Sequence, residues 1–314
     1  MKKLKFKKID AFASYSSSGN PAAVIYLDSM EDLSEMEMLT IAKELKGFVS
    51  EVGYVCLGTD TDYRLRYFSS EREVAFCGHA TIAILHDIIV NTESLKSQKS
   101  LSIATQSERL MVENRYIDNE TVYISAPFPK YSDIGTQLPD IASAMNSDIS
   151  SFDETTPVKV IDAGLETLIV PMSGLEKILS LSPDLNSLNE FCVQIGVDIV
   201  IVYSSEVATE GSSYRTRVFA PTFGYLEDPA TGSGNSAFGY YLLNQGLWDG
   251  SAIKIEQNGN FHSPNYVHLF SKTADDGAAQ VWFGGGAVLK IDGYYILIGG
   301  DIARVWLPWQ TSHL

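Results

Sequence analysis

The sequence is poor in cysteine, in basic residues and in long apolar runs, and each shortage excludes a class of protein. Its three cysteines, Cys56, Cys77 and Cys192, show no C-x-x-C spacing, so neither a disulfide framework nor a zinc knuckle is indicated. Lysine and arginine number 23 against 39 aspartates and glutamates. The net charge of −16 argues against nucleic acid and anionic membranes as partners, because both need a basic surface. No apolar run is long enough to span a bilayer.

The sequence also lacks the spacing of a metal site and the markers of export. Four of its five histidines, His86, His262, His268 and His313, show no ligand spacing with one another or with the cysteines, so we expect no catalytic metal. The lysines among the first eight residues interleave with apolar residues, which predicts a first strand rather than a targeting segment. No apolar signal-peptide region follows them, so a cytoplasmic protein is expected.

An internal repeat is the most informative feature that is present. Tyr-Arg-Leu-Arg-Tyr-Phe at 63–68 returns as Tyr-Arg-Thr-Arg-Val-Phe at 214–219, and Ile-Asp-Ala at 9–11 returns at 161–163. The copies start 151 and 152 residues apart, close to half of the 314 residues. A chain of this length suits two domains, so we predict a duplicated fold of two related halves. Sites often lie where such halves meet, because clefts favour domain interfaces.

Each half is predicted to wrap strands around one apolar helix. The helices at about 79–90 and 234–245 have almost no polar face, and a helix that is apolar nearly all round is buried on all sides. A third helix begins at a capping box of Ser34 and Glu37 and is expected to end at Gly47. Strands are predicted at 3–10, 22–28, 51–57, 63–68, 158–162, 166–171, 198–203, 214–219, 266–270, 280–283 and 287–290.

The predicted fold class is therefore α+β. We expect two pseudo-symmetric halves, each a curled, mostly antiparallel sheet around a central buried helix. Residues 126–131 contain two prolines, which a central strand does not accommodate, and are assigned to the linker. The expected domains are 1–125 and 126–314, with about the last dozen residues crossing back to the first.

Both apolar helices begin in glycine-rich loops, Cys77-Gly78-His79 and Thr231-Gly232-Ser233. The N terminus of a helix presents unpaired N–H groups and a positive dipole end. Two such ends facing each other across a cleft could hold a small carboxylate-bearing ligand. The alternative is that the glycines only allow the helices to start tightly.

Five side chains near these loops could take part in chemistry, and each has a structural alternative. His79 is either an acid/base or a hydrogen-bonded cap, Asp228 belongs to a turn, and Ser233 fits an N-cap. Cys77 is either a thiolate favoured by the helix end or a small packing residue. Glu51 could be an ordinary carboxylate at a strand start, but its apolar neighbours could raise its pKa towards neutrality and make it a general acid/base.

These segments together resemble the PhzF-like family, which is named for an isomerase of phenazine biosynthesis. Six ordered blocks, spread along the whole chain, carry the resemblance. They are 9–12 with 18–24, 50–52, 66–68, 73–74 with 77–81, 218–221, and Glu227-Asp228-Pro229-Ala230-Thr231-Gly232-Ser233-Gly234.

The resemblance implies a fold similar to that of diaminopimelate epimerase, and a shared site. It implies that Glu51 shuttles the proton and that His79, Asp228 and Ser233 line the same pocket. It also implies that backbone N–H groups hold a substrate carboxylate. The substrate-binding positions implied are Gly19, Asn20, Gly78, Gly232 and Ser233.

The chain departs from the family pattern at a few positions. Val52 and Gly53 replace the usual threonine and alanine after the glutamate, Phe76 replaces a leucine, and Gly234 replaces an alanine. Diaminopimelate epimerases use two cysteines, one per half. Here Cys77 stands near the first place, but Thr231-Gly232-Ser233 occupies the second, so two-thiol racemisation is not expected.

The function predicted is a cofactor-free and metal-free isomerase that moves a proton on a small carboxylate-bearing substrate, by double-bond shift or epimerisation. One alternative is a hydrolase with a Ser233, His79 and Asp228 triad, against which the absence of a G-x-S-x-G elbow weighs. A second is a dinucleotide binder at residues 232–237, and a third is a binding protein without turnover. The sequence does not name the substrate, and it leaves open whether the protein forms a homodimer.

Overall fold

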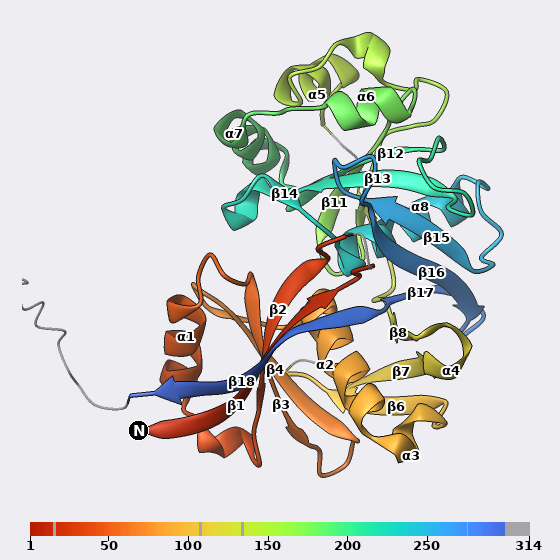
Figure 1. Ribbon diagram of the computed structural model, residues 1–314. Coiled ribbons are helices and arrows are strands. Elements are labelled where there is room, and N and C mark those ends of the chain that lie inside the picture. Colours follow the sequence, from red (N-terminus) through yellow and green to blue (C-terminus); the bar gives the residue numbers. More distant parts are fainter. Residues whose placement is uncertain (15–16, 107–108, 133–134, 275, 299–314) are drawn as a thin grey trace, which may run out of the picture.

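The computed structural model describes residues 1–14, 17–106, 109–132, 135–274 and 276–298 (Figure 1). Within them, the strands join into one large mixed sheet that is curled around two helices. The lower body in Figure 1 surrounds α2 (Gly78–Asn91), and the upper body surrounds α8 (Gly232–Asn244). Most strand pairings are antiparallel, as the sequence predicts. The fold is thus a mixed α/β fold.

The strands of the lower body pair in chain order, except that the short β5 pairs only with β4, which also pairs with β6. The parallel pairs are β2 with β3 and β4 with β6, and the remaining pairs of this series are antiparallel. The strands are β1 (Lys2–Ala11), β2 (Asn20–Tyr26), β3 (Glu51–Leu57), β4 (Tyr63–Ser69), β5 (Glu73–Val74), β6 (Ser100–Ala104), β7 (Arg109–Arg115) and β8 (Thr121–Ser125).

The upper body repeats this order of antiparallel and parallel pairs. Its parallel pairs are β11 with β12 and β13 with β15, and the short strand in the place of β5 is β14. The strands are β9 (Lys130–Ser132), β10 (Lys159–Asp162), β11 (Glu166–Pro171), β12 (Ile199–Ser204), β13 (Tyr214–Phe219), β14 (Glu227–Asp228), β15 (Ile253–Gln257), β16 (Asn265–Thr273) and β17 (Ala279–Gly285). The chain then returns to the lower body as β18 (Ala287–Leu297).

Two pairings join the bodies. β8 pairs with β17 in antiparallel register, so the last strand of the lower series lies beside the last strand of the upper series. β18 then runs back and pairs with β1 along its whole length. The predicted domain limits remain a prediction, and the last dozen residues lie outside the described part of the chain. The predicted linker 126–131 is two residues too long, because Lys130 and Tyr131 already pair with β10.

The two central helices are buried as predicted. α2 packs against β1, β2, β3, β8 and β18, and α8 packs against β10, β11, β12, β16 and β17. Residues 79–85 and 234–242 are fully buried. The surrounding strands therefore fix the position of each helix. Each helix presents its N terminus to the junction of the bodies (Figure 1).

Shorter helices cover the outer faces of the sheet. α1 (Glu35–Glu44) starts at the predicted Ser34–Glu37 capping box, but it ends at the C-cap Leu45, two residues before Gly47. α5 (Leu138–Ala144), α6 (Leu175–Ser180) and α7 (Leu185–Ile195) pack over the outer side of the upper sheet in a separate apolar cluster. α3 (Glu93–Lys96), α4 (Tyr116–Asn119) and the 3₁₀ turns Met30–Asp32, Ile149–Ser151 and Pro221–Phe223 complete the elements.

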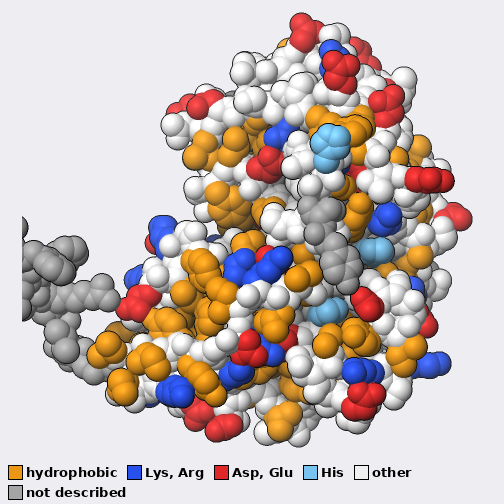
Figure 2. Space-filling view, viewed as in Figure 1, with side chains coloured by type: hydrophobic (Ala, Val, Ile, Leu, Met, Phe, Trp, Pro, Cys, Tyr) orange, Lys and Arg blue, Asp and Glu red, His pale blue; other side chains and the backbone are white. Residues whose placement is uncertain are grey.

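The surface of the lower body carries apolar side chains where β18 runs (Figure 2). Leu289, Ile291, Tyr294 and Ile296 of this strand are each more than two-fifths exposed. Apart from β1, none of the described strands pairs with β18. The homodimer named in the sequence analysis remains a prediction. Among the described residues, no helix has the length and apolar character needed to cross a membrane.

Candidate active site

Glu51 is the first residue of β3, which lies between β2 and β4. The register places it beside Ala22 and Ser69, at the end of β2 where Asn20 reaches Asp228 of the upper body. Its side chain is 15% exposed, and its Oε2 lies 3.3 Å from Nε2 of His79. That oxygen is buried and has no hydrogen-bond partner. A buried carboxylate oxygen without a hydrogen-bond partner is costly, so the charged form of Glu51 is disfavoured in this setting.

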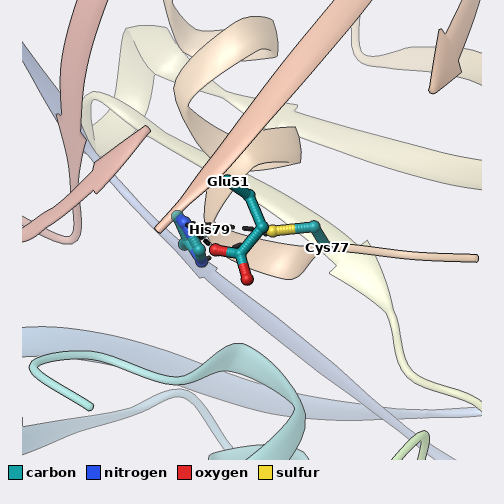
Figure 3. Close-up of side chains that lie close together, drawn as sticks. All are labelled: Glu51, Cys77 and His79. Atoms are coloured by element: carbon teal, nitrogen blue, oxygen red, sulfur yellow. Dashed lines mark hydrogen bonds and ion pairs between the residues drawn. The ribbon is translucent and has the colours of Figure 1, made fainter. Parts of the chain in front are cut away.

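Cys77 and His79 reach the same place from the start of α2 (Figure 3). Cys77 is the N-cap residue, and its Sγ lies 3.5 Å from Nδ1 and 3.9 Å from Nε2 of His79. Burial lowers the pKa of His79 to about 4, so the imidazole is neutral at physiological pH. Burial, followed by the charge of Glu51, raises the pKa of the Cys77 thiol well above its usual range. The sulfur is therefore a thiol here, not a ready nucleophile.

Asp228 is the last residue of the two-residue strand β14. Its side chain is buried, and both of its oxygens accept hydrogen bonds. Asn20 Nδ2 donates to Oδ1 at 2.7 Å, and Thr231 Oγ1 donates to Oδ2. Burial raises its pKa to about 7, although these two hydrogen bonds oppose the shift. Asp228 is thus held firmly in one orientation.

A buried glutamine, Gln257 on β15, supports the loop that carries Asp228. Its Nε2 donates to the Asp228 carbonyl at 2.9 Å, and its Oε1 accepts from the N–H of Thr231 at 3.0 Å and from Asn235 Nδ2 at 2.6 Å. The sequence analysis missed this residue because a single glutamine in a strand carries no recognisable pattern. Thr231 is the N-cap residue of α8, and its hydroxyl donates to the Asp228 carboxylate.

Gly19 directly precedes β2, and Asn20 is the first residue of that strand. Asn20 Nδ2 also donates to the Ala230 carbonyl at 2.8 Å, while its Oδ1 is buried without a partner. Gly19 adopts a φ of +65°, and a Cβ there would lie 2.5 Å from the Ala11 carbonyl, so the turn requires glycine. The Gly19 N–H donates to Asn265 at 2.9 Å and is used within the protein. Asn20 Oδ1 is the free acceptor of this segment.

Gly78 and Gly232 bring the two helix N termini together. A Cβ on Gly78 would lie 3.7 Å from the Gly232 Cα, and a Cβ on Gly232 would lie 2.3 Å from the ring of Phe283. Phe283 belongs to β17, opposite Ile124 of β8, at the pairing that joins the bodies. The glycines thus allow both helices to start against one aromatic ring. Their first-turn N–H groups and positive ends converge on the same region.

Ser233 follows Gly232 at the start of α8, and none of the hydrogen bonds found among the described residues joins it to His79 or Asp228, so its place in the shared pocket stays a prediction. A Cβ placed on Gly164 would lie 4.0 Å from the Ser233 Cβ, which puts this serine next to the loop between β10 and β11. His79 contacts Glu51 and Cys77 instead, and the Asp228 oxygens are occupied by other donors. No hydrogen bond among these described residues forms a serine hydrolase triad.

The glycine-rich start of α8 also differs from a dinucleotide fingerprint. A 3₁₀ turn and β14 separate β13 from α8, whereas that fingerprint needs a tight strand–turn–helix.

The electrostatic field links the groups on both sides of the junction. Burial first, and then the charge of Asp228, raises the pKa of Glu51 to about 8. Tyr225 feels the charges of Asp228, Glu51 and Cys77, and burial is the largest cause that raises its pKa. Tyr225 could not be predicted from the sequence, since no motif along the chain marks it. A half-buried phenol, two carboxyl groups, an imidazole and a thiol therefore share one site.

Three donor atoms of this site could also hold a metal ion. The side chains of Glu51, Cys77 and His79 offer ligand atoms that all lie within 4.8 Å of one another. Among the residues that the structure describes, no other group of this kind is found.

Fold and site together define a class of protein: two sheet-wrapped helices whose N termini meet beside a carboxylate, an imidazole and a thiol. The sequence model of the family described as "Phenazine biosynthesis-like protein" (PhzC-PhzF) matches residues 9–293. The chain belongs to this family.

Named relatives and a solved structure agree with that assignment. The chain is 30% identical over 259 residues to the "Uncharacterized isomerase YfhB" of Bacillus subtilis, covering 82% of this chain and 87% of the relative. It is 27% identical over 284 residues to the trans-2,3-dihydro-3-hydroxyanthranilate isomerase of Pseudomonas chlororaphis, covering 89% and 95%. The crystal structure of a PhzF-family protein of Bacillus anthracis superimposes with a TM-score of 0.84 at 22% identity, covering 95% and 100%. The last comparison shows the fold alone.

Proposed function

We propose that the protein is an isomerase that moves a proton between two positions of a small carboxylate-bearing substrate without a cofactor. The observation that carries the proposal is Glu51. Its buried carboxyl group has an oxygen without a hydrogen-bond partner and a pKa of about 8. A carboxyl group with a pKa near the working pH can both accept and return a proton, which is what acid/base catalysis requires.

The other groups divide the remaining tasks. Glu51 takes a proton from a carbon next to an unsaturated or carbonyl-bearing system and delivers it elsewhere on the same substrate. The neutral imidazole of His79 lies 3.3 Å from Glu51 Oε2 without a hydrogen bond to it, close enough to exchange a proton with this carboxyl group. The N–H groups at the starts of α2 and α8 hold the substrate carboxylate and stabilise the delocalised anion. Acid/base assistance supplies about 10²–10⁴-fold, so this oriented field must supply much of the rest.

Asn20 and Asp228 are suited to recognising a donor on the substrate. Asn20 Oδ1 is a buried acceptor without a partner, and Asp228 is a fixed carboxylate beside it. An amine or a hydroxyl group close to the substrate carboxylate would satisfy that acceptor. The name of the Pseudomonas chlororaphis relative describes a cyclic compound of this kind. Cyclic amino acids and hydroxy acids are therefore the first substrates to test.

The finer description of the fold, a duplication, is also part of this proposal. Three observations support it. Phe68 lies opposite Glu73 as Phe219 lies opposite Glu227. Arg66 forms a two-bond pair with Glu73, as Arg217 does with Glu227. The parallel pairs fall at the same places in both series.

The test is solvent isotope exchange. The protein is incubated in D₂O with a panel of cyclic amino and hydroxy carboxylates, and the recovered compounds are examined by NMR and mass spectrometry. Deuterium at a carbon, together with a shifted double bond or an inverted centre, supports the proposal. A compound that binds the wild-type protein in a thermal-shift assay but never exchanges a carbon-bound proton would identify a binding protein without turnover instead.

A further inference from the structure

The donor atoms of Glu51, Cys77 and His79 are arranged like the corners of a metal site (Figure 3). Glu51 comes from the start of β3, and the other two come from the start of α2. Glu51 Oε2 lies 3.3 Å from His79 Nε2, and that nitrogen lies 3.9 Å from Cys77 Sγ.

These separations fit tetrahedral zinc. Zinc binds sulfur at about 2.3 Å and nitrogen or oxygen at about 2.0–2.2 Å, so tetrahedral angles separate an oxygen from a nitrogen by about 3.3 Å and a nitrogen from a sulfur by about 3.6 Å. The oxygen-to-nitrogen distance of 3.3 Å already matches, whereas the sulfur lies 3.9 Å from Nε2 and 3.5 Å from Nδ1, so the Cys77 side chain or the imidazole ring must turn for the sulfur to share an ion on Nε2. Thiolate, imidazole and carboxylate together favour zinc over magnesium or calcium, which prefer oxygen ligands.

An independent observation points to a ligand at the same spot. Glu51 Oε2 is buried with no hydrogen-bond partner, and a cation would satisfy it. Asp228 does not compete for the ion, because both of its oxygens accept hydrogen bonds from Asn20 and Thr231. Three protein ligands with an open fourth position is the arrangement in which zinc keeps a water or binds an added anion.

We propose that Zn²⁺ binds to Glu51, Cys77 and His79, and that its binding inhibits the isomerase. On binding, the Cys77 thiol loses its proton to solvent and the sulfur forms a bond to the metal, with no change in oxidation state. Glu51 Oε2 then holds the ion and cannot take a proton from the substrate. Only the inhibition rests on the function proposed above, since the metal site stands on the donor geometry alone.

The test uses cobalt as a spectroscopic stand-in. Reduced, metal-free protein is titrated with Co²⁺, and we expect one equivalent to produce intense visible bands typical of four-coordinate cobalt and a near-ultraviolet thiolate-to-cobalt band. Zn²⁺ should displace both. In Cys77→Ser the thiolate band should vanish, and Zn²⁺ affinity should fall at least about tenfold, the smallest loss seen when even an outer-shell partner is removed. The matched control Cys56→Ser, which removes another buried thiol, should keep the band.

The outcomes separate the two proposals. A thiolate band that survives in Cys77→Ser, or that Cys56→Ser also abolishes, overturns the metal site. With an identified substrate, turnover should fall in step with zinc occupancy and return with EDTA, and full turnover at full occupancy overturns the inhibition. If cobalt binds through Cys77 but the protein turns over no substrate, the metal site stands and the isomerase function fails.

Discussion

Glu51 and Asp228 lie in different halves of the molecule, and their surroundings differ in one respect. Both are shielded from solvent, and burial is the main cause that raises both pKa values, to about 8 and about 7. Asp228 has a donor on each oxygen, whereas Glu51 Oε2 has none. Hydrogen bonds to a carboxylate stabilise its charged form and fix its orientation. Under the proposed function, this difference suits Asp228 to positioning the substrate and Glu51 to transferring the proton.

The strand registers show how one framework yields two such different groups. Val52 lies opposite Phe68, and Val200 lies opposite Phe219, so Glu51 in the first half corresponds to Ile199 in the second. In the same way, Asp228 lies opposite Val218, while its counterpart Val74 lies opposite Tyr67. Under the duplication proposed above, each carboxylate thus replaces an apolar residue in only one half. The site is asymmetric although its frame repeats.

The largest expected effect is the loss of turnover in Glu51→Gln. Glutamine keeps the shape of the side chain but cannot accept a proton at neutral pH. Turnover should therefore fall by at least about 10²-fold, while ligand affinity stays within about tenfold. Steady-state kinetics and calorimetric titration measure the two quantities. Retained turnover would transfer the role to His79 or Asp228 and would break the division of tasks between the two carboxylates.

The same variant should become more stable relative to the wild type as the pH rises, because only the wild type must bury an ionisable group at this position. Glu51 has a pKa of about 8 in the folded protein and about 4.3 in an unfolded chain. Below about pH 4.3 the group is protonated in both states, so its pKa shift has no effect on the free energy of unfolding. Between the two pKa values only the unfolded chain loses the proton, so the free energy of unfolding falls steadily as the pH rises. The stability of the wild type relative to Glu51→Gln should thus decline between about pH 4 and pH 8, by on the order of 5 kcal/mol. Denaturant titrations at several pH values measure it. A difference that is constant with pH would place the Glu51 pKa near its ordinary value.

The two helix-start glycines should also differ. A Cβ at Gly232 would lie 2.3 Å from the Phe283 ring, whereas at Gly78 the nearest ring carbon would be 3.1 Å away. Overpacking a core costs about 1–3 kcal/mol, so Gly232→Ala should fall in that range and Gly78→Ala below it. Thermal unfolding of both variants gives the comparison. Equal losses would mean that the Phe283 ring moves aside as readily for one helix as for the other.

Much of this architecture was predictable from the sequence because its evidence is local. The all-apolar stretches gave α2 and α8, and the Ser34–Glu37 box gave the start of α1. α7 was missed, although its Asp184 N-cap and the left-handed Gly196 at its end are local features too. The length of β18 was missed for another reason: its partner β1 lies at the opposite end of the chain, and no local pattern encodes that pairing.

The candidate site was predictable only in part. Motifs nominated Glu51, His79 and Asp228. That Glu51 has an oxygen without a donor depends on which residues surround it in space. Gln257 and Tyr225 likewise enter the site only through the folding of distant segments. A triad of Ser233, His79 and Asp228 is consistent with residue types alone, and the partners that His79 and Asp228 have in the structure are other residues.

The smallest effect tests the electrostatic link between the two carboxylates. The charge of Asp228 is the second cause, after burial, that raises the Glu51 pKa. If Glu51 must be ionised to act as the base, kcat/KM of the wild type rises with pH through the apparent pKa values of the coupled pair, near 7 and 8. Removing the like charge lowers the Glu51 pKa, so in Asp228→Asn this limb should move to lower pH by about half a unit to one unit.

The turnover of Asp228→Asn at its own optimum should fall only about tenfold, because an orienting group is weakened rather than the base removed. Glu93→Gln removes the same formal charge from an exposed position on α3 and should leave the limb in place. If Asp228→Asn moved the limb to higher pH, the charge of Asp228 would be assisting the ionisation of Glu51. If Asp228→Asn abolished turnover as completely as Glu51→Gln, Asp228 would be a second reacting group, and the contrast between a held and an unpartnered carboxylate would no longer separate their roles.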